Sequence, residues 1–136
     1  MATRWILIVI LAVGFFFRIY RIDSVPPSAS LDEVSLGYNA YSIMRTGADE
    51  YGTKFPVLLR AYDDWRPALY AYLVIPLLPI FDLSVVSVRL PSVLLGVIAL
   101  FLVYKITIHI FKEESIALVA SFFLAISPWH IYLSRL

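Results

Sequence analysis

The sequence predicts an all-α integral membrane protein with three transmembrane helices and a long loop that carries interfacial helices. The first observation is composition: 61% of the 136 residues are hydrophobic and 15% are charged, whereas a typical soluble domain carries about 25% charged residues. The mean hydropathy is +0.84. The second observation is that the apolar residues form three long runs, and the third is that most acidic residues gather in one loop.

Charge and cysteine content exclude several classes of function. Eleven basic residues against ten acidic ones give a net charge of +1, which is no basic footprint for a nucleic acid. The chain has no cysteine, so disulfides, thiolate metal sites and cysteine nucleophiles are excluded. No metal-ligand spacing stands out, so we assign no metal and no certain cofactor, although the acidic residues leave a divalent cation open.

The first predicted transmembrane helix covers residues 5–22. Its residues 5–17 carry no charge, and about 20 apolar residues are needed to cross a bilayer. A basic residue precedes it, but no small-residue cleavage site follows, so we expect a retained anchor and not a signal peptide. Arg18 and Arg21 are expected to reach the headgroup region from the end of this helix.

Two further transmembrane helices are predicted at 90–111 and 115–134, both of them apolar over most of their length. Pro128 should kink or end the last one within about a turn of the membrane surface, because proline removes a backbone donor. Trp129 and Tyr132 are expected in the interfacial aromatic belt.

A fourth apolar run, residues 67–81, is too short and too rich in proline for a simple span. It is more typical of an interfacial or re-entrant segment, although four spans stay an alternative to three. With three spans, Arg4 before the first helix would lie on the same side of the membrane as Lys105 and Lys112, near the turn at 111–114. Basic residues favour the cytoplasmic side, so we expect a cytoplasmic N-terminus. The loop 23–88 and the C-terminus would then lie outside, within one module that covers 1–136.

The loop 23–88 holds the polar residues. Seven of the ten acidic residues lie between Asp23 and Asp64, and loops of this length are usually functional. Ser30 and Glu33 have the spacing of a capping box, so a helix should run from 31 to about 45, ended by Thr46-Gly47.

That helix is expected to lie along the outer leaflet on an apolar and aromatic stripe, with Asp32 and Asn39 together on another face. The stripe comprises Val34, Gly37, Tyr38, Tyr41 and Met44. Glu33 fits a helix cap. Asp32 is not needed for the cap and is open to two interpretations: a partner of the helix dipole, or a catalytic carboxylate beside the membrane.

Arg66 is likewise open to two interpretations. It follows Asp63 and Asp64, which fits a turn with a local ion pair, but its planar guanidinium also suits a phosphate at the headgroup level. At the end of the chain, His130 fits a hydrogen-bonded interface residue and Arg135 a snorkelling one. With three spans, Asp32, Arg66 and Arg135 would meet at one membrane face.

Several segments of the sequence resemble bacterial GT-C glycosyltransferases, most closely the protein O-mannosyltransferase and aminoarabinose-transferase-like group. They are LDEVSLGYNAYSI at 31–43 with Thr46-Gly47 and DEYG at 49–52, RPALY at 66–70, RLPS at 89–92, and SPWH at 127–130 with Ser134-Arg135. In RPALY, arginine stands where that group commonly has lysine, and Ala68 where it commonly has a second proline. The matches are in order and spread over nearly the whole chain.

The resemblance implies an enzyme that passes a sugar from a polyprenyl phosphate carrier to an acceptor on the outer face of a bacterial-type inner (plasma) membrane. Asp32 would be the general base, and Arg66 and Arg135 would face the charge that develops on the departing phosphate. Tyr70, with the short helix of 67–80, would line the access path of the lipid. Glu33, Asp64 and His130 are the remaining expected substrate-binding residues.

The resemblance also implies a size, because members of this group run to several hundred residues with more membrane helices. We therefore expect the chain to be an N-terminal module, incomplete or a short stand-alone relative, that need not be active alone. The expected partners are the lipid-linked sugar donor, an unknown acceptor and the bilayer. The alternative function is a small non-enzymatic membrane scaffold or partner-binding subunit. A transporter or channel is a poor third, because ionisable residues are missing from the middle of the spans.

Overall fold

The computed structural model describes residues 2–61 and 64–135 and divides the chain into two compact units. One unit is formed by Met1–Ile22 and Ser92–Leu136, and the other by Asp23–Pro91. The first is the helical unit and the second is the loop unit. The described chain is mostly helical, as predicted, but it also contains a small sheet that the sequence did not predict.

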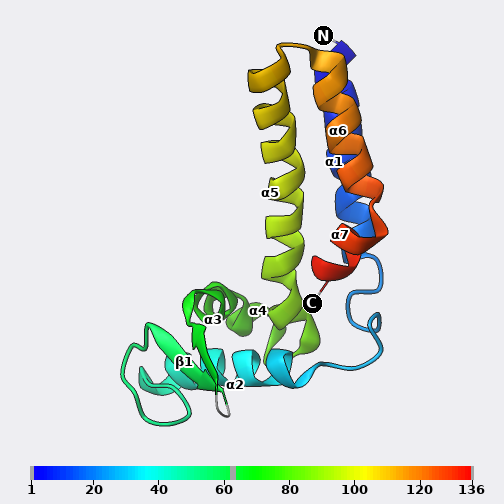
Figure 1. The fold of residues 1–136 in the computed structure, drawn as a ribbon. Helices are drawn as coiled ribbons and strands as arrows, with labels where there is room; N and C mark the ends of the chain where they lie inside the picture. The colour runs from blue at the N-terminus through cyan, green and yellow to red at the C-terminus, as the bar shows by residue number, and fades with distance from the viewer. Residues whose placement is uncertain (1, 62–63, 136) are drawn as a thin grey trace. The chain divides into compact units, whose positions relative to one another are not determined.

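The helical unit contains α1 (Ala2–Ile19), most of α5 (Val85–Phe111), α6 (Glu114–Ile126) and α7 (Pro128–Leu133). Helix α6 lies along α1, and the turn between α5 and α6 lies at the same end of the unit as the N-terminus (Figure 1). Ile10, Leu100 and Ala125 form its buried apolar core. Gly14 allows α1 to approach α5 closely, because a Cβ there would collide with Leu100.

Several helix boundaries differ from the predicted ones. Helix α1 ends at Ile19 and not at residue 22, and α5 begins at residue 85 and not at 90. The predicted helix 115–134 is two helices, α6 and α7, separated by Ser127 in an extended conformation. The predicted break at Pro128 is thereby confirmed. Among the described residues, α5 is the one helix that is long and apolar enough to cross a membrane.

In the loop unit, α2 (Leu31–Thr46) has the ends that the sequence predicts. Ser30 and Glu33 form the reciprocal capping box: Glu33 N donates to Ser30 Oγ over 3.2 Å, and Ser30 N donates to Glu33 Oε2 over 2.7 Å. At the other end, Gly47 has φ 73° and donates its N–H to the carbonyl of Ile43. Glycine suits this left-handed position because it has no Cβ.

The predicted apolar stripe of α2 is divided between a buried residue, Gly37, and residues that stay exposed on the loop unit. Val34 is 57% exposed and Tyr38 is 51% exposed, because the core of the loop unit is contacted by the neighbouring face of the helix. The buried residues of α2 are Glu33, Gly37, Asn39, Ala40 and Ile43. Asn39, expected beside Asp32 on a polar face, is buried and exchanges hydrogen bonds with Glu50.

A two-stranded antiparallel sheet follows α2, formed by β1 (Leu58–Ala61) and β2 (Asp64–Pro67). Leu59 pairs with Arg66 in its register, and Leu59 is buried in the core of the loop unit. The predicted turn at 63–67 is therefore mostly strand. Asp63 lies outside the described residues.

The proline-rich run 67–81 forms three short helical segments and not one continuous helix. They are α3 (Leu69–Val74), the 3-10 turn η1 (Ile75–Leu77) and α4 (Leu78–Phe81). Pro76 and Pro79 stand near the starts of the last two segments, where a missing N–H is tolerated. Ala71, Val74 and Leu78 are buried in the apolar core to which α2 also contributes. The interfacial segment that the sequence predicts is consistent with this broken form.

Gly37→Ala should destabilise the loop unit, because the new Cβ would lie 2.8 Å from Val88 Cγ2 and 3.3 Å from Leu83 Cδ1. Overpacking of this kind costs about 1–3 kcal/mol, against about 1 kcal/mol gained in helix propensity. Thermal unfolding of the purified chain is the measurement. Ser42→Ala on the same helix is the control and should not lower the midpoint; an equal fall in both variants would contradict the packing argument.

Candidate functional site

The candidate site of the loop unit is an ion pair between Asp32 and Arg66. Arg66 Nη1 lies 2.7 Å from Asp32 Oδ1, and the side chains are 29% and 63% exposed, respectively. Asp32 stands in the first turn of α2, and Arg66 is the third residue of β2. The two predicted residues are thus brought together by the packing of the hairpin on α2.

Asp64 is the second carboxylate at Arg66. Its Oδ2 lies 3.5 Å from Arg66 Nε, so the predicted local ion pair is present alongside the contact to Asp32. The hydrogen bond that Arg66 donates to Asp32 is the main cause that raises the pKa of Arg66, and the contact with Asp64 adds to it. Arg66 Nη2 makes no hydrogen bond to any described residue, so its N–H groups can donate to an oxyanion.

Glu33 binds a residue that the sequence analysis missed, Arg89 at the start of α5. Arg89 Nε lies 2.5 Å from Glu33 Oε1, and Arg89 Nη2 lies 3.4 Å from Glu33 Oε2. Arg89 is 0% exposed and Glu33 is 5% exposed. The signal available in the sequence was a lone arginine just before an apolar run, which by itself resembles a snorkelling residue.

The same guanidinium also holds the segment that leads into α2. Arg89 Nη1 donates to the carbonyl of Pro26 and Nη2 to that of Ser28, each over 3.1 Å. Burial acts to raise the pKa of Glu33, but the hydrogen bonds from Arg89 and Ser30 outweigh it, and the pKa lies below its ordinary value. Glu33 is thus a buried, ionised anchor directly beside Asp32.

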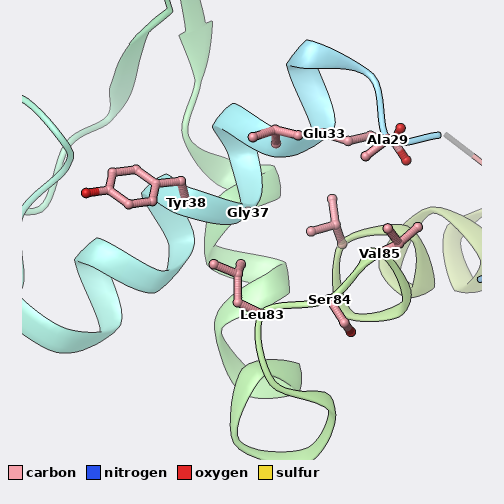
Figure 2. Close-up of a pocket in the computed structure, with 9 residues that line it drawn as sticks. Ala29, Glu33, Gly37, Tyr38, Leu83, Ser84 and Val85 are labelled. Atoms are coloured by element: carbon pink, nitrogen blue, oxygen red, sulfur yellow. The ribbon is translucent and has the colours of Figure 1, made fainter.

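An apolar pocket of about 320 Å³ opens beside this anchor. Figure 2 shows Glu33, Gly37 and Tyr38 of α2 on one side, with Leu83, Ser84 and Val85 on the other. Ala29, Val34 and Val88 complete the lining. All of these residues belong to the loop unit.

Tyr70, expected on the access path of the lipid, has its hydroxyl engaged within the loop unit. It donates to the carbonyl of Val88 over 2.7 Å, which ties α3 to the first turns of α5. This hydrogen bond fixes the position of the Tyr70 side chain. The expected role of Tyr70 on the access path of the lipid stays a prediction.

His130 and Arg135 belong to the helical unit, so the predicted convergence of Arg135 with Asp32 and Arg66 stays a prediction. Arg135 Nη2 donates to the carbonyl of Tyr20 over 2.6 Å and to that of Arg21 over 3.3 Å. Arg135 therefore caps the end of α1. His130 Nδ1 lies 2.6 Å from a guanidinium nitrogen of Arg18.

The predicted position of Arg18 is wrong. It was expected to reach the headgroups, but its side chain is fully buried. The reason is that carbonyl oxygens of α6 and the ring of His130 offer it acceptors inside the unit.

Within the described part of the chain, no group of three or more histidine, aspartate and glutamate side chains is placed to hold a metal ion. What the arrangement offers chemically is an exposed carboxylate that touches a cation, on a helix whose first turn is fixed by a buried ion pair. A carboxylate in such a position can accept a proton from a hydroxyl, while the guanidinium can bind an anionic oxygen.

Residues 65–136 match the family model described as dolichyl-phosphate-mannose-protein mannosyltransferase. This match covers Arg66, Tyr70, Arg89, His130 and Arg135, and it begins after α2, so it does not include Asp32. Comparison with curated proteins and with solved structures finds no match.

Arg89→Met should lower the free energy of unfolding by about 3–5 kcal/mol, because it leaves the buried carboxylate of Glu33 without its cation. The measurement is chemical or thermal unfolding of the chain at neutral pH. Arg45→Met is the matched control: Arg45 is exposed and only stacks on Tyr41, so its loss should cost less than about 0.5 kcal/mol. Equal effects would show that the buried pair does not anchor α2.

The stability that Glu33 contributes should depend on pH with a definite sign. Because its pKa is lowered in the folded chain from 4.5, the contribution is complete above that value and is lost as the pH falls through the lowered pKa. Wild type should therefore exceed Glu33→Gln in stability at neutral pH, and the two should converge in acid. A gap that persists unchanged at low pH would refute the linkage.

Proposed function

The chain belongs to the dolichyl-phosphate-mannose-protein mannosyltransferase family, and we propose that it is a membrane module that moves a sugar from a polyprenyl phosphate carrier to an acceptor outside the cell membrane. The observation that carries this proposal is the ion pair of Asp32 and Arg66 on the loop unit. It puts a general base and an anion-binding cation in contact at the end of one helix.

In the proposed reaction, Asp32 takes the proton of the acceptor hydroxyl as its oxygen attacks the anomeric carbon of the sugar. The bond from that carbon to the phosphate oxygen breaks, the electron pair leaves with the phosphate, and the configuration at carbon inverts. A base that removes the proton in the transition state contributes about 10²–10⁴-fold to such a rate. The exposure of Asp32 supports this role, because the acceptor must reach the carboxylate.

The departing phosphate gains negative charge, and Arg66 is proposed to bind it. Its Nη1 and Nε contact Asp32 and Asp64, which orient the guanidinium and leave Nη2 for an oxyanion. Positioned donors of this kind stabilise charge that develops in the transition state. We therefore assign Asp64 to the positioning of Arg66.

The other expected substrate-binding residues receive supporting roles in this proposal. Glu33 anchors α2 through Arg89, and Tyr70 fixes α3 through the carbonyl of Val88. Arg135 would have to release the carbonyls at the end of α1 before it could bind a phosphate.

We propose three membrane spans, formed by α1, α5 and the pair α6 and α7. The apolar surfaces of α1, α5 and α6 support this, because large aliphatic and aromatic side chains on all three are exposed. Arg4 stands in the first turn of α1, Lys105 in the last two turns of α5 and Lys112 between α5 and α6. The N-terminus and the α5–α6 turn lie at the same end of the helical unit (Figure 1). Basic residues favour the cytoplasmic side, which leaves the loop unit outside.

Asp32→Asn should lower transfer from polyprenyl phosphate mannose to a hydroxyl-bearing peptide by about 10²–10⁴-fold, because the amide cannot accept the proton. Transfer of radiolabelled mannose by the chain in lipid bilayer discs is the measurement. Asp23→Asn removes another exposed carboxylate of the same unit and should leave the rate unchanged. A rate that survives in Asp32→Asn would remove Asp32 as the base.

Donor binding separates the cation from the base. Titration of a polyprenyl phosphate into the chain in the same discs should be weakened at least tenfold by Arg66→Gln and unaffected by Asp32→Asn. Arg60→Gln on the neighbouring strand is the control for charge alone. If the wild-type chain shows no saturable binding of the polyprenyl phosphate, the proposed function is wrong and the non-enzymatic scaffold is favoured.

The proposed topology can be tested with single cysteines, because the chain has none of its own. In right-side-out vesicles, an impermeant thiol reagent should label Ser28→Cys in the loop unit and should not label Ser115→Cys at the start of α6. Both positions are exposed in the structure, so a missing signal reports the membrane. The reverse pattern would overturn the orientation, and labelling of both would overturn the span count.

A further inference from the structure

The helical unit encloses a buried arginine that the proposed mechanism does not use. Arg18 is 0% exposed. Its Nη1 donates to the carbonyl of Gly14 over 2.7 Å and to that of Ala125 over 3.2 Å, while Nη2 donates to that of Leu124 over 3.4 Å. The last contact of Nη2 is the ring nitrogen Nδ1 of His130, at 2.6 Å.

The break before α7 explains why Arg18 finds acceptors there. In a continuous helix, the N–H of residue 128 would bond to the carbonyl of Leu124, but Pro128 has no N–H. The N–H of Ser127 donates to that carbonyl over 3.4 Å, which is a long hydrogen bond, and Ser127 itself is extended and ends the helix. Carbonyls at a helix end need donors, and Arg18 provides them.

No acidic side chain of the helical unit is near enough to balance Arg18. The acidic residues of this unit are Glu113 and Glu114, at the start of α6, and Ala125 is eleven residues further along that helix, or about 16 Å. Arg21 and Arg135 are further basic residues of this unit, and Arg135 donates to the carbonyls of Tyr20 and Arg21. The charged group that His130 contacts is Arg18.

This contact determines the form of the His130 ring. A guanidinium is always charged and can only donate, so Nδ1 must be the acceptor. A neutral imidazole that accepts at Nδ1 carries its proton on Nε2. A doubly protonated ring would set two donors and two positive charges against each other at this contact.

Ser134 does not compete for this assignment. Its Oγ lies 3.3 Å from Nδ1, but it lies only 2.6 Å from the carbonyl of His130, to which the hydroxyl donates. Gly96 allows this packing, since a Cβ there would lie 2.6 Å from Ser134 Oγ and 3.1 Å from Arg18 Nε. Among the described residues, Nε2 of His130 makes no hydrogen bond.

We propose that Arg18 is a positioning residue that holds His130 as a neutral imidazole with its proton on Nε2. His130 then offers a hydrogen-bond donor to a phosphate oxygen and is neither a base nor a cation. The assignment of phosphate as the ligand rests on the proposed function, whereas the ring state of His130 follows from the helical unit alone.

The test is the ring state itself, read from long-range ¹H–¹⁵N spectra of the chain with ¹⁵N-labelled histidine in bilayer discs. The chain has two histidines. His109 is exposed and lies on α5, so its resonances serve as the internal reference. His130 should keep the neutral Nε2–H pattern from about pH 5 to about pH 8. Protonation on Nδ1 anywhere in this range would overturn the proposal.

Two variants identify the residue that sets this state. Arg18→Met should allow His130 to titrate or to populate both tautomers, whereas Ser134→Ala should leave the Nε2–H pattern intact. A changed tautomer in Ser134→Ala would assign the control to Ser134 and refute Arg18 as its source. If Arg18→Met does not fold, the wild-type and Ser134→Ala spectra still decide the question.

Addition of a short-chain polyprenyl phosphate tests the ligand. The Nε2–H resonance of His130 should shift with saturation, and that of His109 should not. If the phosphate binds but His130 does not shift, the ligand contact is wrong while the proposed function stands. If the phosphate does not bind although the Nε2–H pattern is present, the proposed function fails and the ring assignment stands.

Discussion

The candidate site depends on the buried ion pair of Glu33 and Arg89. Removal of two charges from water is costly unless their hydrogen-bonding groups are satisfied, and here Arg89 also bonds to the carbonyls of Pro26 and Ser28. Because Glu33 completes the capping box as well, one carboxylate both starts α2 and attaches it to α5. Successive residues of a helix point about 100° apart, so a buried Glu33 leaves Asp32 exposed on a fixed turn.

The helical unit contains the opposite arrangement, a buried arginine balanced by neutral acceptors. Arg18 bonds to carbonyls on α1 and α6 and to His130. Its charge is therefore spread over dipoles, and none of the described carboxylates forms an ion pair with it. Such a site stays electropositive. An anion near Arg18 would compete only with neutral carbonyl and imidazole acceptors, whereas at Arg89 it would compete with the carboxylate of Glu33. This difference is why His130 can be assigned a single proton position, while Glu33 is simply ionised.

The features that the sequence predicted are those set by neighbouring residues. The capping box, the glycine that ends α2 and the break at Pro128 each depend on side chains within a few positions. Arg89 and Glu33 are 56 residues apart, and Arg18 bonds to a carbonyl 107 residues away, so neither role had a local signal. The buried face of α2 and the hairpin were missed because the tertiary partners decide which face is covered.

The two adjacent acids of α2 differ in how readily they can change partners, and this supports a chemical role for only one of them. Glu33 is enclosed, and separation from Arg89 would leave a buried charge unpaired. The pair of Asp32 and Arg66 is partly exposed, and exposed ion pairs contribute only about 0–1 kcal/mol. A general base must exchange its resting partner for the proton of an acceptor at little cost. Asp32 meets that condition, and Glu33, one residue later, does not.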